Sequence, residues 1–144
     1  MRATVGLPMS EELSILGSGV SRPSKTLETF PNRNPGRFYL VQLHSDEFTC
    51  VCPQTGQPDF ATIRVRYVPD ASVVESKSFK LYLWSYREEG VFHEHVVNTI
   101  LDDIISAAVP HWCEVVGDFS VRGGVSIIVT AEQVRTAEAR AQWR

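Results

Sequence analysis

The chain has 144 residues, a formal net charge of −3 and an ordinary globular composition, with 43% hydrophobic and 22% charged residues. This length fits one domain, and the acidic balance argues against a nucleic-acid-binding protein, which would carry a basic surface. No apolar run reaches the roughly 20 residues needed to span a bilayer, and the N-terminus lacks the apolar segment of a signal peptide.

The first part of the chain has the composition of loops. Residues 1–35 are rich in Ser, Pro, Gly, Asn and Thr, and the stretch Pro31-Asn32-Arg33-Asn34-Pro35-Gly36 is typical of turns. We expect an extended and partly disordered N-terminal arm over these residues, with a short helical turn over Glu11–Leu16.

Two strands with a loop between them are predicted next. Phe38–Leu43 has the composition of a strand, and Phe60–Val68 alternates between apolar and polar residues, as a half-buried strand does. Between them, Phe48–Asp59 is predicted to be a loop, because Cys52-Pro53 and Gly56-Gln57-Pro58 both break regular structure.

Two helices follow. Glu75–Tyr86 carries apolar residues at helical spacing, and Gly90 is expected to separate it from the next element. Phe92–Ala108 has a wide apolar stripe with a period of 3.6 residues, and Pro110 is expected to end this second helix.

Two more strands are predicted over Cys113–Val121 and Val125–Val129, joined by a hairpin turn at Arg122-Gly123-Gly124. The order strand, strand, helix, helix, strand, strand predicts an α+β fold, an antiparallel four-stranded sheet with two helices on one face. Closure of several subunits into a shared barrel would pair the open sheet edges and enlarge a small core. We therefore expect a domain over residues 36–130, a C-terminal tail over residues 131–144 and a homo-oligomeric ring.

The three cysteines do not suggest a disulfide framework. Their number is odd, and Cys50 and Cys52 are separated by one residue, so that their sulfurs would be too far apart for an unstrained disulfide. A reducing, cytoplasmic compartment is therefore expected.

Cys52 is the best candidate for a catalytic residue. It lies in a Gly- and Pro-rich loop, where functional residues often occur, and Asp59 follows at the start of the next predicted strand. A thiol nucleophile needs a neighbour that accepts or returns protons, and a carboxylate can do this. The alternative is that Cys52 is a small buried hydrophobic residue, but its loop favours the catalytic role. Cys50 and Cys113 are predicted to be packing residues.

Two further groups could bind ligands. His93 and Glu94 lie at a helix start, where the carboxylate either stabilises the helix or accepts hydrogen bonds from a guanine-like base. Lys77 and Lys80 share a helical face, which is either a solvated basic surface or a site for an anionic ligand such as a dinucleotide phosphate. No Gly-x-Gly-x-x-Gly pattern is present, so a Rossmann cofactor site is not expected.

Together these segments resemble the NADPH-dependent 7-cyano-7-deazaguanine reductases of queuosine biosynthesis. The family hallmark matches Glu75–Tyr82 residue for residue, and the nucleophile loop matches Cys52–Phe60. Phe92-His93-Glu94 and Arg122-Gly123-Gly124 match further elements, and the similarity covers about residues 37–130. It implies the tunnelling fold, in which subunits close into a ring barrel with sites at subunit interfaces. Glu94 and Cys52 of one site can then belong to different chains.

The resemblance also implies a mechanism. The Cys52 thiolate attacks the nitrile carbon of 7-cyano-7-deazaguanine to form a covalent thioimide, Asp59 acts as the proton donor, and two NADPH molecules complete the reduction to the primary amine. The substrate is the free base, so tRNA is not expected to bind. The residues expected to bind the substrate are Val74, Glu75, Ser76, His93 and Glu94. Those expected to contact the cofactor are Lys77, Lys80 and Arg122.

Two other functions stay open. A zinc enzyme similar to GTP cyclohydrolase, which shares the tunnelling fold, could use Cys50, Cys52, Cys113 and histidines as ligands. Cys50 and Cys52 are closer together than the usual spacing of about two to four intervening residues, so we expect no metal site. A non-catalytic base-binding ring is the third possibility, against which Asp59 argues because its position after the thiol has no evident structural reason.

Overall fold

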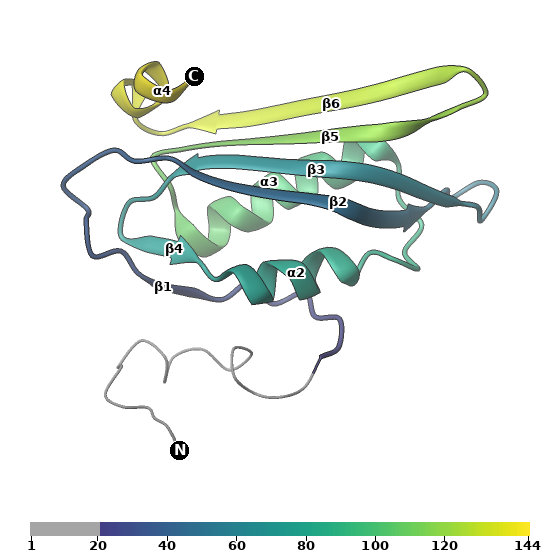
Figure 1. The fold of residues 1–144 in the computed structure, drawn as a ribbon, viewed down its shortest axis with the longest axis horizontal. Helices are drawn as coiled ribbons and strands as arrows, with labels where there is room; N and C mark the ends of the chain where they lie inside the picture. The colour runs from purple at the N-terminus through teal and green to yellow at the C-terminus, as the bar shows by residue number, and fades with distance from the viewer. Residues whose placement is uncertain (1–20) are drawn as a thin grey trace.

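The computed structural model describes residues 21–144, so the helical turn expected over Glu11–Leu16 lies outside its described part. The elements are β1 (Thr29–Pro31), β2 (Val41–Val51), β3 (Pro58–Val68), β4 (Ser72–Val74), α2 (Ser76–Trp84), α3 (His93–Ala108), β5 (Trp112–Arg122), β6 (Val125–Val134) and α4 (Ala137–Trp143). Four strands form an antiparallel sheet in the order β2-β3-β5-β6, and β1 pairs separately with β4. Helices α2 and α3 lie on one face of the sheet (Figure 1).

The core lies between the sheet and these two helices. Alternate residues of β3 face the helices, and the apolar stripe of α3 packs against them, so each element buries the residues that its period predicts. This confirms the expected α+β fold with an antiparallel four-stranded sheet and two helices on one face. The fully buried side chains of this layer include Ile63, Val65, Tyr67, Val96, Val97, Ile100 and Ile104.

The first pair of strands is longer than the sequence predicted. The strand expected at Phe38–Leu43 begins at Val41 and continues to Val51, so the loop expected over Phe48–Asp59 is wrong and shrinks to residues 52–57. An irregularity in the pairing between Ser45 and Phe48 shifts the alternation within this edge strand. Because polar residues surround that shift, the sequence pattern did not predict one continuous strand.

The other boundaries differ less. Glu75 is the N-cap of α2 and lies outside the helix, which ends at Trp84 instead of Tyr86. Strand β6 continues past Val129 to Val134, and α4 occupies most of the remaining tail. Within residues 21–144, no helix has both the length and the apolar character needed to cross a membrane.

Part of the segment expected to be an arm packs against the domain. The Ser24 amide donates to the Leu81 carbonyl at 3.2 Å, and the Glu28 amide donates to the Ser78 hydroxyl at 3.0 Å. β1 then pairs with β4. Residues 24–28 therefore lie along α2, and residues 29–31 lie along β4 (Figure 1).

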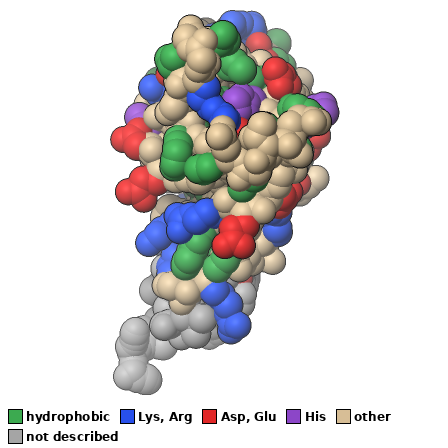
Figure 2. Space-filling view, turned by 90° about the vertical axis from the view of Figure 1, so that its right-hand side faces the viewer, with side chains coloured by type: hydrophobic (Ala, Val, Ile, Leu, Met, Phe, Trp, Pro, Cys, Tyr) green, Lys and Arg blue, Asp and Glu red, His purple; other side chains and the backbone are tan. Residues whose placement is uncertain are grey.

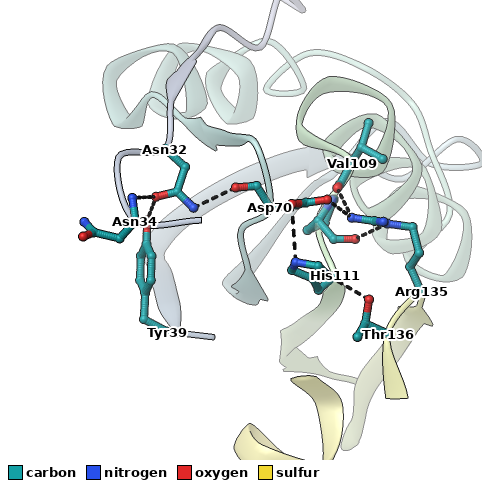
Figure 3. A network of polar contacts seen from close by, with 9 residues as sticks. Asn32, Asn34, Tyr39, Asp70, Val109, His111, Arg135 and Thr136 are labelled. Carbon is teal, nitrogen blue, oxygen red and sulfur yellow. Dashed lines mark hydrogen bonds and ion pairs between the residues drawn. The ribbon is translucent and has the colours of Figure 1, made fainter. Parts of the chain in front are cut away.

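A polar network holds the C-terminal elements at the end of the sheet opposite the 52–57 loop (Figure 3). Arg135 donates to Asp70 Oδ2 at 2.6 Å and to the Val109 carbonyl at 3.0 Å. His111 contacts Thr136 Oγ1 at 2.7 Å and lies 3.5 Å from Asp70. These contacts join the end of β6 and the start of α4 to the loops beside them.

Candidate active site

A short loop presents Cys52 at one end of the sheet. The Cys52 amide donates to the Gln57 carbonyl at 2.8 Å, and the Gly56 amide donates to the Cys52 carbonyl at 2.9 Å. Gly56 has φ +75°, a left-handed conformation that glycine adopts without strain. The loop is therefore closed by its own backbone, with the Cys52 side chain partly exposed. Figure 2 looks onto this end of the molecule, where acidic, basic and histidine side chains are interspersed.

The turn before α3 supports the loop from one side. The Val51 amide donates to the Glu89 carbonyl, and the Val91 amide donates to the Val51 carbonyl, both at 3.0 Å. Gly90 packs on Pro53, and a Cβ atom there would lie in ordinary contact, 3.4 Å from the Pro53 Cα atom. The position of the nucleophile loop therefore depends on the position of residues 89–91.

Hydrogen bonds within the loop lower the pKa of the Cys52 thiol. The largest contribution comes from the Thr55 hydroxyl, followed by the backbone N–H groups of Thr55 and Gln54, all of which stabilise the thiolate. Partial desolvation and the negative charge of Asp59 oppose this effect but do not reverse it. The loop therefore favours the nucleophilic form of sulfur.

The other two cysteines behave in the opposite way. Burial raises the pKa of Cys50 to about 12, and the negative charge of Asp59 adds to the effect. Burial also raises the pKa of Cys113 to about 12. Both are packing residues, as expected. Within residues 21–144, no group of three or more His, Cys, Asp or Glu side chains is arranged to hold a metal ion.

Asp59 is buried beside this loop with a basic partner on each carboxylate oxygen. Its side chain is 4% exposed, Arg122 donates to Oδ1, and His93 Nε2 lies 3.1 Å from Oδ2. Arg122 also donates to Gln57 Oε1 at 2.5 Å. The His93 ring stacks on Phe119 with centroids 3.8 Å apart, which fixes the imidazole plane. Asp59, His93 and Arg122 therefore form one connected polar cluster next to Cys52.

The predicted substrate pair divides into a partly buried and an exposed side chain. His93 points at Asp59, whereas Glu94 is exposed in the first turn of α3. Among the described residues, no side chain or backbone N–H donates to the Glu94 carboxylate. That carboxylate is therefore available to accept hydrogen bonds from a ligand.

The stretch Val74-Glu75-Ser76 lies away from Cys52. Val74 and Glu75 precede α2 and Ser76 is its first residue, and the nine residues of the helix span about 14 Å before the chain continues toward the Cys52 loop (Figure 1). The Glu75 carboxylate accepts hydrogen bonds from the amides of Lys77 and Ser78 at 2.8 and 2.7 Å. One chain therefore brings together Cys52, Asp59, His93 and Arg122, but not the stretch around Glu75.

A groove of about 480 Å³ separates α2 from the edge strand β2. Its apolar floor includes Phe79, and Lys80 and Arg87 are basic residues in its lining. The Arg87 guanidinium lies 5.4 Å from the centre of the Trp84 ring, which also lines the groove. Lys80 thus faces this groove, whereas Lys77 is partly buried on a neighbouring side of α2.

Known proteins match this chain over most of its length. Residues 58–138 match the family described as QueF-like protein. The chain belongs to this family. A relative from Syntrophus aciditrophicus (strain SB), named NADPH-dependent 7-cyano-7-deazaguanine reductase, is 61% identical over 120 residues, which cover 83% of this chain and 85% of the relative. A protein of the same name from Thermomicrobium roseum is 57% identical over 122 residues, covering 85% and 95%.

A solved structure supports the QueF assignment and the fold. The crystal structure of the archaeosine synthase QueF-Like in the apo form has a TM-score of 0.62 and 30% identity to this chain, covering 65% of this chain and 92% of that one. The family model and the relatives named as reductases confirm the family resemblance predicted from the motifs.

Sequence reasoning missed three residues of this site in the QueF-family chain. Thr55 stabilises the thiolate, Gln57 accepts from Arg122, and Phe119 stacks on His93. Thr55 and Gln57 lie within Cys52–Phe60, the segment that resembles the family's nucleophile loop, so the sequence offered a signal for both. Phe119 gave no signal beyond its place in the alternating apolar pattern of Cys113–Val121.

Proposed function

We propose that this QueF-family chain is an NADPH-dependent nitrile reductase, which converts 7-cyano-7-deazaguanine into 7-aminomethyl-7-deazaguanine. The observation that carries the proposal is the contrast among its three cysteines. Hydrogen bonds lower the pKa of the partly exposed Cys52 thiol, whereas burial raises the pKa of Cys50 and Cys113 to about 12. A nitrile carbon is an electrophile that a thiolate attacks, and Cys52 is the thiol of this chain whose pKa is lowered toward that form.

The bond changes follow from the position of Cys52. Asp59 accepts the Cys52 thiol proton as the sulfur forms a bond to the nitrile carbon, the C≡N triple bond becomes a C=N double bond, and Asp59 passes this proton to the nitrogen. Two hydride equivalents from NADPH supply the four electrons of the overall reduction. Between the two transfers the carbon–sulfur bond breaks, and the electron pair returns to Cys52 as a thiolate. His93, 3.1 Å from Asp59, relays the replacement protons.

Arg122 and Glu94 have binding roles in this proposal. Arg122 holds Asp59 and Gln57 in place at the mouth of the loop. The exposed Glu94 carboxylate accepts hydrogen bonds from the N–H groups of the deazaguanine base, for which two adjacent oxygens are suited.

We infer that a second subunit completes the site. The stretch Val74-Glu75-Ser76 is too far from Cys52 in one chain to bind the same small base, so these residues would serve the site of a neighbour in a homo-oligomeric ring. The long edge strands β2 and β6 offer unpaired backbone groups for such an assembly. The enzyme would act on the free base in the cytoplasm, without binding tRNA.

The groove beside α2 is the proposed location for the cofactor. Lys80 and Arg87 supply positive charge, Trp84 supplies an aromatic surface, and Thr49 places one end of the groove three residues before Cys52. A dinucleotide phosphate has the charge and the flat rings that this lining accepts. The other two residues expected to contact the cofactor, Lys77 and Arg122, do not line this groove. Arg122 is already paired with Asp59.

Intact-mass spectrometry tests the covalent step. Addition to a nitrile expels nothing, so the wild-type protein mixed with 7-cyano-7-deazaguanine should gain the whole mass of one substrate molecule. Cys52→Ala should show no gain, and Cys50→Ala, the matched control two residues away, should retain it. NADPH oxidation should then reach two equivalents for each nitrile. A wild-type protein without the adduct, or an adduct on Cys52→Ala, would overturn the proposal.

A further inference from the structure

The N-terminal segment contacts the turn that supports the nucleophile loop. Lys25 Nζ lies 2.6 Å from Glu89 Oε1 and 3.7 Å from the centre of the Tyr86 ring. Ser24 is hydrogen bonded to the Leu81 carbonyl, and this fixes the segment on α2 immediately before the turn. We call residues 24–28, which lie on α2 and this turn, the N-terminal strap.

The turn transmits this contact to the catalytic loop through the backbone. The Glu89 amide donates to the Tyr86 carbonyl at 3.0 Å, and the Glu89 carbonyl accepts from the Val51 amide at 3.0 Å. Gly90 then packs on Pro53, the residue after Cys52. The side chain of Glu89 is thus held by the strap and its carbonyl by the nucleophile loop.

The other anchors of this turn are mainly backbone hydrogen bonds. Glu89 and Gly90 are exposed and belong to no helix or strand, although Gly90 forms an isolated bridge with Val51. The buried Tyr86 ring is the fixed point, because its hydroxyl contacts the Tyr82 hydroxyl at 2.9 Å within the core. The ammonium group of Lys25 therefore contacts both the exposed Glu89 of the turn and the buried Tyr86 ring.

We propose that Lys25 is a positioning residue for the reaction, which holds the 86–91 turn so that the loop keeps Cys52 in its reactive geometry. This inference rests on the proposed function only in taking Cys52 as the nucleophile. Lys25 touches neither the sulfur nor the substrate, so its effect passes through Glu89. Without the strap, the turn loosens, the loop shifts, and the hydrogen bonds of Thr55 to the sulfur weaken.

Alkylation of Cys52 by iodoacetamide across a range of pH measures this effect without substrate or NADPH. Lys25→Met keeps the apolar stem over Tyr86 but removes the charge, and we expect Cys52 to react about threefold to tenfold more slowly near pH 7, with the profile moved to higher pH. Glu89→Gln should behave alike. Lys25→Arg should restore the wild-type profile. Asp59 of β3, whose negative charge acts on Cys52, is unchanged in all of these variants.

A matched control separates positioning from stability. Arg135 and Asp70 form an ion pair of similar exposure, also at 2.6 Å, at the opposite end of the sheet. Arg135→Met, which also removes the hydrogen bond to the Val109 carbonyl, should lower the melting temperature at least as much as Lys25→Met, yet leave the alkylation profile unchanged. An unchanged profile in both Lys25→Met and Glu89→Gln would overturn the inference. Because alkylation needs no nitrile, this result is independent of adduct formation, which tests the proposed function.

Discussion

Gly117 on β5 is the position where the packing of α3 on the sheet can be tested most directly. A Cβ atom at this glycine would lie 2.6 Å from Val97 Cγ2 and 3.0 Å from Phe119 Cε1. Ordinary van der Waals contact begins at about 3.4 Å, so Gly117→Ala requires α3 to move away from the sheet by about 0.8 Å. Val97 is fully buried, and a β-branched side chain in a helix has one strongly preferred χ1 rotamer.

The magnitude follows from this overlap. Overpacking of a buried site typically costs about 1–3 kcal/mol, which for a chain of this size lowers the melting temperature by about 3–12 °C. The same shift reaches the site, because Phe119 stacks on His93, the first residue of α3. A displacement close to 1 Å between His93 and Asp59 should lower kcat about 10- to 100-fold.

Thermal and urea denaturation followed by circular dichroism measure the first effect, and NADPH oxidation with the nitrile measures the second. Gly36→Ala is the control, since a Cβ atom at Gly36 would meet nothing within 4 Å. A Gly117→Ala protein with the wild-type melting temperature and wild-type kcat would refute the packing of α3 on β5 described above.

Three further outcomes are expected. Thr55→Val removes the hydroxyl that lowers the pKa of Cys52. Because the rate of adduct formation increases with the thiolate fraction, a stopped-flow pH profile of this variant should show the rate rising at higher pH than in wild type. Glu75→Ala leaves two amides at the start of α2 without their acceptor and should lower the free energy of unfolding by about 1 kcal/mol, whereas an unchanged urea midpoint would contradict the cap. Iodoacetamide at pH 8 should label only Cys52 in the folded protein, because burial raises the pKa of Cys50 and Cys113 to about 12, and mass spectrometry should find three labels only after denaturation.

The regular parts of the fold could be predicted because their residues face one core. Phe92–Ala108 differs from α3 only in that Phe92 is the N-cap, since an apolar stripe at 3.6-residue spacing specifies both the element and its buried side. Strand β2 was harder, because it is an edge strand with polar residues on both sides of an irregularity near Ser45. Its extent depends on pairing with β3, which local patterns do not contain.

The candidate site could be predicted in its residues but only partly in its contacts. The turn-forming sequence around Cys52 made that residue a candidate, and Asp59 was near in sequence. The Arg122–Asp59 ion pair joins residues 63 positions apart, and the contact of His93 with Asp59 depends on how α3 packs on the sheet. Side-chain partners of this kind follow from the pairing of β3 with β5. This pairing could not be read from the sequence before the fold was known.

The different chemistry of Cys50 and Cys52 follows from where β2 ends. Cys50 pairs across the ladder with Asp59 on the core-facing side, and Val51–Pro58 is the last pair. Beyond it the Cys52 amide bonds to the far side of the loop, and its thiol meets hydroxyl and N–H donors instead of the core. One more ladder pair in the same register, Cys52 with Gln57, would give Cys52 the inward direction of Cys50, because alternate residues of a strand share a face. Burial would then raise the pKa of its thiol, so the reactivity of this sulfur depends on the ladder stopping one residue before it.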